Sequence, residues 1–388
     1  MLPISSPPAC RFGLHDSVNV YDARLSANNV SRIFRKRFRE RAGEAVLNIK
    51  ELARHLDLSI GTVSRALNDK PDVNPQTRER VLNAAIELGY SANASGRSLR
   101  RGSTQTIAFM LETGHPELST GHNFFMRVIG AMQPELHREG FDLVILPCHP
   151  TTDPTSFLRR TIARGMADAI IVTATQCNDP RIELLLKSRI PFVALGRSRF
   201  QDRHPWIDLD FERFVDVTMD ELVRRGHERI AMTILPNDSN ISHVLRDAYA
   251  AAHERLGLKH DPALIVTSDA SEFGGNQATR QILAMERPAT AILLNNEQMA
   301  FGVYAALFEA GLTPGRDMSV ATLRRSKQLR FLNPPVTAFD IDLEALGREL
   351  AKQALRALRG ETPLAALLWP SHFVPTDSLA DVPGTLSD

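Results

Sequence analysis

The sequence predicts a small all-α domain of three helices, followed by an α/β body of two doubly wound subdomains. The chain has 388 residues, which is too long for one ordinary hydrophobic core. After Thr104 the apolar pattern changes from helical spacing to alternating strand and helix signals. The charge changes at the same point, from net +7 over residues 1–104 to net −6 over residues 105–388. We therefore expect only the N-terminal part to meet a polyanion.

The composition is that of a soluble globular protein, with 43% hydrophobic and 23% charged residues. No apolar run approaches the roughly 18 residues of a membrane span, and the N-terminus lacks the apolar core of a signal peptide. The chain is therefore expected to be cytoplasmic and nucleoid-associated, with no membrane partner. Cys10, Cys148 and Cys177 have no metal-ligand or redox spacing, so no metal and no cofactor are expected.

Residues 1–47 are predicted to be a disordered basic extension. Residues 1–44 have no sustained apolar periodicity and end in the basic run "SRIFRKRFRER". Two interpretations stay open. The segment is either a tail, which includes the case of a start codon assigned too far upstream, or a basic arm that grips DNA.

Three short helices are expected within residues 48–92. "NIKELARHL" and the helix that Ser59 begins as a cap both carry apolar residues at helical spacing. The third, "NPQTRERVLNAAIELGY", has Asn74 as cap, Pro75 at its first position and Gly89 as stop. The residues expected to face the core are Ile49, Leu52, Ala53, Leu56, Val63, Ala66, Leu67, Val81, Leu82, Ala85 and Leu88.

The second helix has an unusual polar edge. Thr62, Ser64, Arg65 and Asn68 are short or cationic side chains opposite the apolar face of "SIGTVSRALN". An edge of this kind can enter the major groove of DNA and bind base edges or phosphates. The alternative is a solvated helical hairpin with no ligand.

The body shows two βα halves of similar rhythm. The expected strands are "TIAFML", "FDLVILP", "DAIIVT" and "PFVAL" in the first half and "RIAMTI", "ALIVTS", "TAILLN" and "MSVATL" in the second. "RHPWIDLDFERF" lies between the halves, which predicts a cleft there. "NPPVTAFDIDLEALGRELAKQALRAL" predicts a strand and a long amphipathic helix that crosses back to the first half.

From Asn48 to Ala108, the chain resembles the headpiece of the lactose/galactose repressor family of bacterial transcriptional regulators. The residues that carry this resemblance are "TVSRALN", "VNPQTRERVL", "ELGY" and "RSLRRG", with "ELVRRGHERIA", "LLNNEQMAFG" and "NPPVT" in the body. The resemblance implies a helix-turn-helix headpiece, a hinge helix and a periplasmic-binding-protein-like body. It also implies a homodimer whose small-molecule effector changes the affinity for DNA.

With this resemblance, the expected headpiece spans residues 48–92 and the hinge spans residues 93–104. The effector-binding and dimerisation body spans residues 105–388. Its N-subdomain is expected at about 105–207 plus 342–362, and its C-subdomain at about 208–341 plus 363–388.

The resemblance assigns DNA contacts to both parts of the N-terminal region. Ile60 and Gly61 match a variable base-reading pair, Arg65 matches an arginine that contacts bases or phosphates, and Thr62 and Ser64 match backbone and edge contacts. Ser59 and Asn68 complete the predicted set on this helix. In the hinge, Asn93, Gly96 and Leu99 match residues that enter the minor groove, with Leu99 as the wedge. Gly96 stands where alanine is usual, and glycine costs a helix up to about 1 kcal/mol, so this hinge is expected to fold only on DNA.

The predicted effector residues are Phe124, Phe125, Trp206, Asp208, Asp210, Asn296 and Arg324. Each has a second interpretation. Phe124 and Phe125 are a pocket wall or ordinary core, and Asn296 caps the next helix, contacts ligand, or does both. Asp208 and Asp210 bind sugar hydroxyls or belong to a solvated crossover, and Trp206 stacks on a sugar ring or packs.

Two positions depart from the family pattern. Arg324 stands where the family has a sugar-binding aspartate, and Leu245 stands where many members have a pocket arginine, with Arg246 beside it. If Arg324 faces the pocket, the effector carries an anionic group, or Asp208, Asp210 or Glu297 neutralises the guanidinium and leaves a pocket for a neutral sugar. Both alternatives stay open.

These observations predict a transcriptional repressor of carbohydrate uptake or catabolism genes, and not an enzyme. Its partners are pseudo-palindromic double-stranded operator DNA, a carbohydrate-derived effector and a second copy of the chain, with a tetramer as an alternative. A periplasmic solute-binding protein would fit the body alone, but it does not fit the headpiece. An enzyme would need a nucleophile elbow, a phosphate loop or clustered metal ligands, and the sequence shows none of these motifs.

Overall fold

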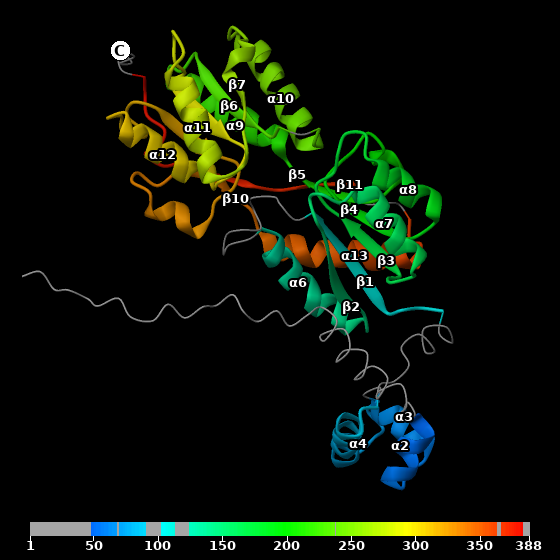
Figure 1. Ribbon diagram of the computed structural model, residues 1–388. Helices are drawn as coiled ribbons and strands as arrows, with labels where there is room; N and C mark the ends of the chain where they lie inside the picture. The colour runs from blue at the N-terminus through cyan, green and yellow to red at the C-terminus, as the bar shows by residue number, and fades with distance from the viewer. Residues whose placement is uncertain are drawn as a thin grey trace, which may run out of the picture. The chain divides into compact units, whose positions relative to one another are not determined.

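The structure is a computed structural model that describes residues 48–67, 70–90, 102–112, 124–236, 238–362 and 366–382. The chain divides into two compact units, residues 1–94 and residues 95–388 (Figure 1). Within the described residues, no helix is both long enough and apolar enough to cross a bilayer. Asn68 and the predicted hinge residues Asn93, Gly96 and Leu99 lie outside the described residues, as does the extension 1–47.

The described part of the first unit contains the three expected helices, α2 (Ile49–Leu56), α3 (Ile60–Leu67) and α4 (Pro75–Glu87). Asn48 caps α2 in a reciprocal pair with Glu51, which satisfies two otherwise unpaired amides at the helix start. Asn74 caps α4, and Pro75 is its first residue. Gly89 follows α4 with a φ of +63°, so the predicted start and stop signals of this helix are confirmed.

Most of the expected core residues of this unit are buried together. The buried side chains are Leu52, Ala53, Leu56, Val63, Ala66, Val73, Val81, Ala84 and Ala85. The inward placement of Leu82 and Leu88 was wrong, because they are 42% and 36% exposed. Ala84 is buried in their place, since the narrow contact with α2 and α3 covers only one side of α4.

The N-subdomain contains a parallel sheet with the strand order β11-β5-β4-β3-β1-β2. Its strands are β1 (Thr106–Glu112), β2 (Asp142–Cys148), β3 (Ala169–Val172), β4 (Phe192–Leu195), β5 (Trp206–Leu209) and β11 (Ala366–Trp369). One face packs on α6 (Phe124–Arg138) and α13 (Leu343–Arg359), and the other on α7 (Pro154–Ala163) and α8 (Pro180–Ser188). Because successive residues of β1, β3 and β4 enter different cores and helices cover both faces, the subdomain is doubly wound as predicted.

The C-subdomain repeats this plan with the strand order β12-β10-β9-β8-β6-β7. Its strands are β6 (Ile230–Ile234), β7 (Ile265–Thr267), β8 (Ala291–Leu294), β9 (Ser319–Thr322), β10 (Thr337–Asp340) and β12 (His372–Val374), of which only β12 pairs antiparallel. One face packs on α9 (Phe211–Arg224) and α10 (Asn240–Leu256), and the other on α11 (Glu272–Leu283) and α12 (Met299–Glu309). Short 3-10 helices lie at η2 (Gln201–Arg203), η3 (Pro262–Leu264) and η4 (Lys327–Phe331).

The chain passes between the two sheets after β5, after β10 and after β11. The expected subdomain boundaries at residues 208 and 363 therefore differ from the structure. β5 continues in the N-sheet to Leu209, and residues 366–369 pair with β5 before the chain returns as β12. The strand β11 is a short apolar run at the edge of its sheet. A run of this length does not show whether it forms a strand or which strand it pairs with, and its partner β5 is distant in the sequence.

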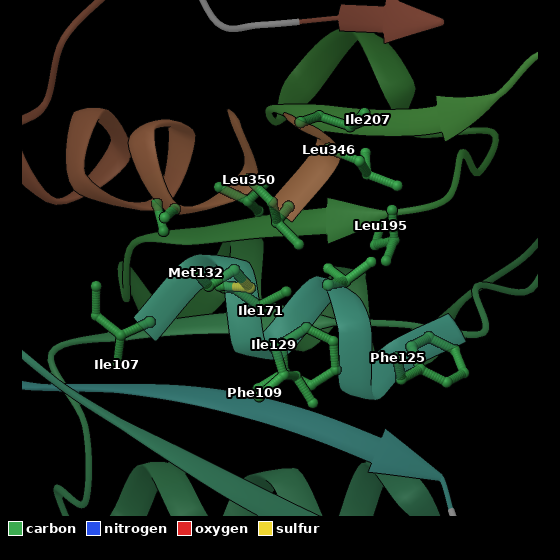
Figure 2. Packing of buried hydrophobic residues seen from close by; sticks show 14 of the residues in the cluster. Ile107, Phe109, Phe125, Ile129, Met132, Ile171, Leu195, Ile207, Leu346 and Leu350 are labelled. Carbon is green, nitrogen blue, oxygen red and sulfur yellow. The ribbon is translucent and has the colours of Figure 1, made fainter. Parts of the chain in front are cut away.

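The helix α13 crosses back to the N-subdomain, as predicted. It lies beside α6, and Figure 2 shows Leu346 and Leu350 facing the same core as Ile129 and Met132. Gly347 allows the close approach of the two helices, because a Cβ atom there would lie 2.3 Å from the carbonyl oxygen of Val128.

This contact predicts the effect of one added methyl group. Gly347→Ala should lower the free energy of unfolding by about 1–3 kcal/mol, because the methyl group meets backbone that must shift. The matched control is Gly130→Ala on α6, where a Cβ atom meets nothing within 4 Å, and where alanine should stabilise the helix by up to about 1 kcal/mol. Urea unfolding of both variants checks this, and equal stabilities would contradict the packing described.

Candidate functional site

The first candidate site is the exposed side of α3. The Ser59 Oγ accepts a hydrogen bond from the Thr62 amide at 3.0 Å and contacts the Thr62 hydroxyl at 2.9 Å, which confirms the expected cap. Val63 and Ala66 are buried, whereas Ser59, Ile60, Gly61 and Arg65 are exposed and Thr62 and Ser64 are half-buried. The helix is therefore anchored by one side, and its small polar side is accessible.

Arg65 lies at the accessible end of this surface. Its Nε is 3.5 Å from a carboxylate oxygen of Asp72, and both side chains are more than half exposed. A pair of this kind contributes little stability in water, so the guanidinium can exchange Asp72 for a phosphate or a base edge. A Cβ atom at Gly61 would meet only Ser59 and Arg65, at 3.6 Å and 4.0 Å, so glycine leaves open space beside Arg65.

The second candidate site is a cavity of about 170 Å³ between the two sheets of the body. It lies where the carboxyl ends of strands from both sheets meet, the usual place for ligands in open α/β sheets. The N-subdomain and first crossing contribute Glu112, Phe124, Phe125, Ala174, Thr175, Gln176, Leu195, Gly196, Asp208, Leu209 and Phe211. The C-subdomain contributes Leu235, Ser239, Asn240, Ile241, Asn295, Asn296, Glu297, Leu323 and Arg324.

Five of the seven predicted effector residues line this cavity: Phe124, Phe125, Asp208, Asn296 and Arg324. Phe124 and Phe125 also belong to the N-subdomain core, with ring centroids 5.2 Å apart in an edge-to-face arrangement. The Asn296 Oδ1 accepts a hydrogen bond from the Gln298 amide at 2.8 Å, so this residue both shapes the turn before α12 and faces the cavity.

Trp206 and Asp210 do not line the cavity. The Trp206 indole is buried among core residues and donates to the Gln201 carbonyl at 3.1 Å, which is the packing interpretation. Asp210 caps α9 by accepting from the Arg213 amide at 3.0 Å. The two carboxylates do not share a strand face, because β5 ends at Leu209 and the chain then turns into α9.

Asp208 is held by Arg197 at the first crossing between the subdomains. The Arg197 Nε donates to the Asp208 carboxylate at 2.9 Å, and its two terminal nitrogens donate to Glu212 at 2.8 and 2.9 Å. Burial raises the pKa of Asp208 to about 6, although Arg197 opposes this shift. Hydrogen bonds from Arg197 and its positive charge lower the pKa of Glu212 against the opposing effect of burial.

Two further ion pairs lie at the cavity. Arg324 pairs with Glu297, both side chains are buried, and the guanidinium carbon lies 5.5 Å from the ring centroid of Phe124. Glu112 accepts from Arg181 at 2.5 Å. Leu245 is fully buried in the core of the C-subdomain and Arg246 is exposed; neither residue lines the cavity.

One loop of the N-subdomain is hydrogen-bonded directly to the C-subdomain. The Asn240 amide donates to the Thr175 carbonyl at 2.9 Å, and Gln176 forms an antiparallel bridge with Ser239. Thr175 also donates to the Arg197 carbonyl at 2.8 Å. Gly196 has a φ of +123°, and a Cβ atom there would lie 2.3 Å from the Thr175 hydroxyl, so only glycine fits beside this loop.

Several polar residues of the cavity were not predicted from the sequence: Glu112, Thr175, Gln176, Ser239, Asn240 and Asn295. A signal for some of them was present, because Glu112 ends a buried strand and Asn295 directly follows one. Among the described residues, no group of three His, Cys, Asp or Glu side chains could hold a metal ion.

Two family descriptions match the chain. Residues 48–93 match "bacterial regulatory proteins, lacI family", and residues 219–379 match "periplasmic binding protein-like domain". The curated HTH-type transcriptional regulator AglR of Rhizobium meliloti is 32% identical over 346 residues, which cover 87% of this chain and 95% of that protein. The ribose operon repressor of Escherichia coli is 27% identical, over 79% of this chain and 91% of its own length.

Among solved structures, the fold is similar to that of the lac repressor dimer bound to operator and the anti-inducer ONPF. The TM-score is 0.72 at 22% identity, and the match covers 87% of this chain and all of that one. The predicted fold class, a helix-turn-helix headpiece with a periplasmic-binding-protein-like body, is confirmed.

The raised pKa of Asp208 predicts a pH dependence of stability. The pKa in the folded protein, about 6, lies above the ordinary value of 3.8, so the folded state takes up this proton first as the pH falls. The contribution of Asp208 to stability should therefore increase by roughly 2 kcal/mol between about pH 7.5 and pH 4.5. Asp208→Asn should lack this contribution.

Urea unfolding of both proteins across this range measures the difference in stability between them. As the pH falls, the free energy of unfolding of the native protein should increase relative to that of Asp208→Asn. A difference in stability that is independent of pH, or that changes in the other direction, would contradict the conclusion that burial raises the pKa of Asp208.

Proposed function

The chain belongs to the lacI family of bacterial regulatory proteins, and from this membership we propose that it is a repressor of carbohydrate uptake or catabolism genes. The proposal has two parts. The headpiece binds a specific operator, and a carbohydrate-derived effector in the cavity of the body changes that affinity. Transcriptional regulators of this family are not enzymes. The proposed place of action is the cytoplasm, where operator DNA lies.

The observation that carries the proposal is the exposed side of α3. Ser59, Ile60, Gly61, Thr62, Ser64 and Arg65 form an accessible surface on a helix whose other side is fixed in the core. A helix that presents small side chains fits the major groove, where hydrogen-bond donors and acceptors distinguish all four base pairs. We assign base contacts to Ile60, Gly61 and Arg65. Asn68, which the sequence adds to this set, lies outside the described residues.

The effector part rests on the cavity. Its wall combines aromatic rings, Phe124 and Phe125, with amide, hydroxyl and carboxylate groups that converge from two subdomains, which is the usual composition of a small-molecule site. The names of two similar proteins agree with this, since one is a ribose operon repressor and the other binds an anti-inducer as well as operator. Because the ligand would touch both subdomains, its binding can change their relative orientation.

We further propose a homodimer on a pseudo-palindromic operator. The lac repressor, whose fold is similar, binds its operator as a dimer, and a two-fold protein reads two half-sites in mirror relation. In the C-subdomain, Phe308 and Phe331 are 83% and 75% exposed. Phe308 lies on α12 and Phe331 ends η4. Tyr304 of α12 joins the two segments by donating to the carbonyl of Pro334, shortly after η4, at 2.8 Å. These aromatic side chains support a contact with a second copy.

Arg65→Ala tests the assignment of DNA contacts. Operator duplexes selected from a random pool should show a two-fold footprint, and the variant should bind them about 1–3 kcal/mol more weakly, with relaxed preference at one position in each half-site. Arg54→Ala is the control, because Arg54 is an exposed arginine on α2 and not on α3. It should weaken operator and random DNA equally. A footprint without two-fold symmetry, or unchanged affinity in Arg65→Ala, counts against the proposal.

Leu99 gives a second prediction, which concerns the hinge. An apolar wedge acts only where the minor groove can be opened, so Leu99→Ala should weaken binding to the operator far more than binding to random duplexes. Fluorescence anisotropy with both duplexes at one salt concentration measures this. An equal loss on the two duplexes would show that Leu99 does not act as a wedge.

A further inference from the structure

Four ionisable side chains line the cavity among the described residues: Glu112, Asp208, Glu297 and Arg324. All three carboxylates are paired with arginines. Arg181 holds Glu112, Arg197 holds Asp208, and Arg324 holds Glu297. The wall of the cavity therefore presents charges that already have partners within the protein.

The pair of Arg324 and Glu297 is the most enclosed of these pairs on the cavity side. The side chains are 7% and 4% exposed, and the guanidinium also faces the ring of Phe124. A guanidinium stays protonated at any ordinary pH, and a buried cation without a counterion is costly. Glu297 supplies this counterion, so Arg324 does not need one from a ligand.

The charges behind the cavity wall leave a negative surplus. Arg181 also binds Asp179 at 2.6 Å, and Arg197 also binds Glu212 at 2.8 Å. The described ion pairs around the cavity thus contain three arginines and five carboxylates. An anionic ligand would lose its hydration and meet this surplus at close range, in a site where charges are weakly screened.

We infer that the cavity accepts a neutral, polyhydroxylated effector and rejects an anionic one, and that Glu297 determines this selectivity by occupying the guanidinium of Arg324. The inference rests on the proposed function, because it concerns the same effector site. Hydroxyl groups suit such a wall, since each can donate to a paired carboxylate and accept from a paired arginine without disturbing the balance of charge.

Glu297 is the residue whose replacement should change the selectivity. Glu297→Gln keeps the shape of the side chain but removes the negative charge, and Arg324 then remains as a buried cation beside the cavity. A carboxylate on the ligand could replace the lost counterion with a charge-assisted hydrogen bond. The double variant Glu297→Gln with Arg324→Gln is the matched control, because it removes both charges and restores the original balance.

The experiment is titration calorimetry on the full chain with pairs of sugars that differ only at C6. The neutral series contains glucose, galactose and their methyl α-glycosides, and the acidic series contains the corresponding uronates. The native protein should bind at least one neutral sugar and its uronate about 100-fold more weakly, a difference of about 2.7 kcal/mol. Glu297→Gln should bind that uronate at least about tenfold more tightly than the native protein does, and the double variant should lose this gain.

The outcomes separate the inference from the proposed function. Native protein that binds a uronate as tightly as its neutral partner, or a folded Glu297→Gln variant with unchanged selectivity, overturns the inference and leaves the repressor proposal standing. If Glu297→Gln is too unstable to titrate, its thermal unfolding temperature is measured with each sugar instead. Uronate should raise this temperature and the neutral sugar should not, and the opposite pattern overturns the inference. Protein that binds operator but no sugar of either series overturns the effector part of the proposed function, and the inference with it.

Discussion

The ion pairs of Arg197 fix the place where the chain first passes from one subdomain to the other. One guanidinium binds Asp208 at the end of β5 and Glu212 in the first turn of α9, so it ties the last central strand of one sheet to the first helix of the other subdomain. The backbone at Arg197 is held by the Thr175 hydroxyl, which donates to the Arg197 carbonyl, and Gly196 leaves the space that this hydroxyl needs. The backbone carbonyl of Thr175 in turn accepts a hydrogen bond from the backbone amide of Asn240, which belongs to the C-subdomain. The shape of the cavity follows from this chain of contacts.

Arginine serves two different purposes in the molecule. Arg65 is exposed and held only by a long contact to an exposed Asp72, so it can change partner at little cost. Arg181, Arg197 and Arg324 are buried or nearly buried and have short contacts to carboxylates, and removal of one partner would leave a buried charge. The arginine of the headpiece is therefore available to a ligand, whereas the arginines of the body are held by carboxylates of the protein itself.

Much of the fold could be predicted, because apolar runs, caps and helix stops are local signals. The strands β1 to β4 and the caps Ser59 and Asn74 are of this kind. The edge strand β11 was not predicted, since an apolar run of four residues does not show whether it forms a strand or which sheet it joins. Leu82 was misplaced because helical spacing does not say which side of a helix is covered. The pairing of Glu297 with Arg324 joins residues that are 27 positions apart. The sequence left this pairing as one of several alternatives. It depends on the pairing of β8 with β9, which brings the residues after the two strands together.

If an effector in the cavity controls DNA binding by the headpiece, the affinities of the two sites must be thermodynamically linked. The measurement is the affinity of the full chain for the tightest-binding neutral sugar, with and without a saturating operator duplex. We expect operator to change the sugar affinity by the same factor by which the sugar changes the operator affinity, on the order of 5–150-fold. Equal sugar affinities in the presence and absence of operator would contradict it.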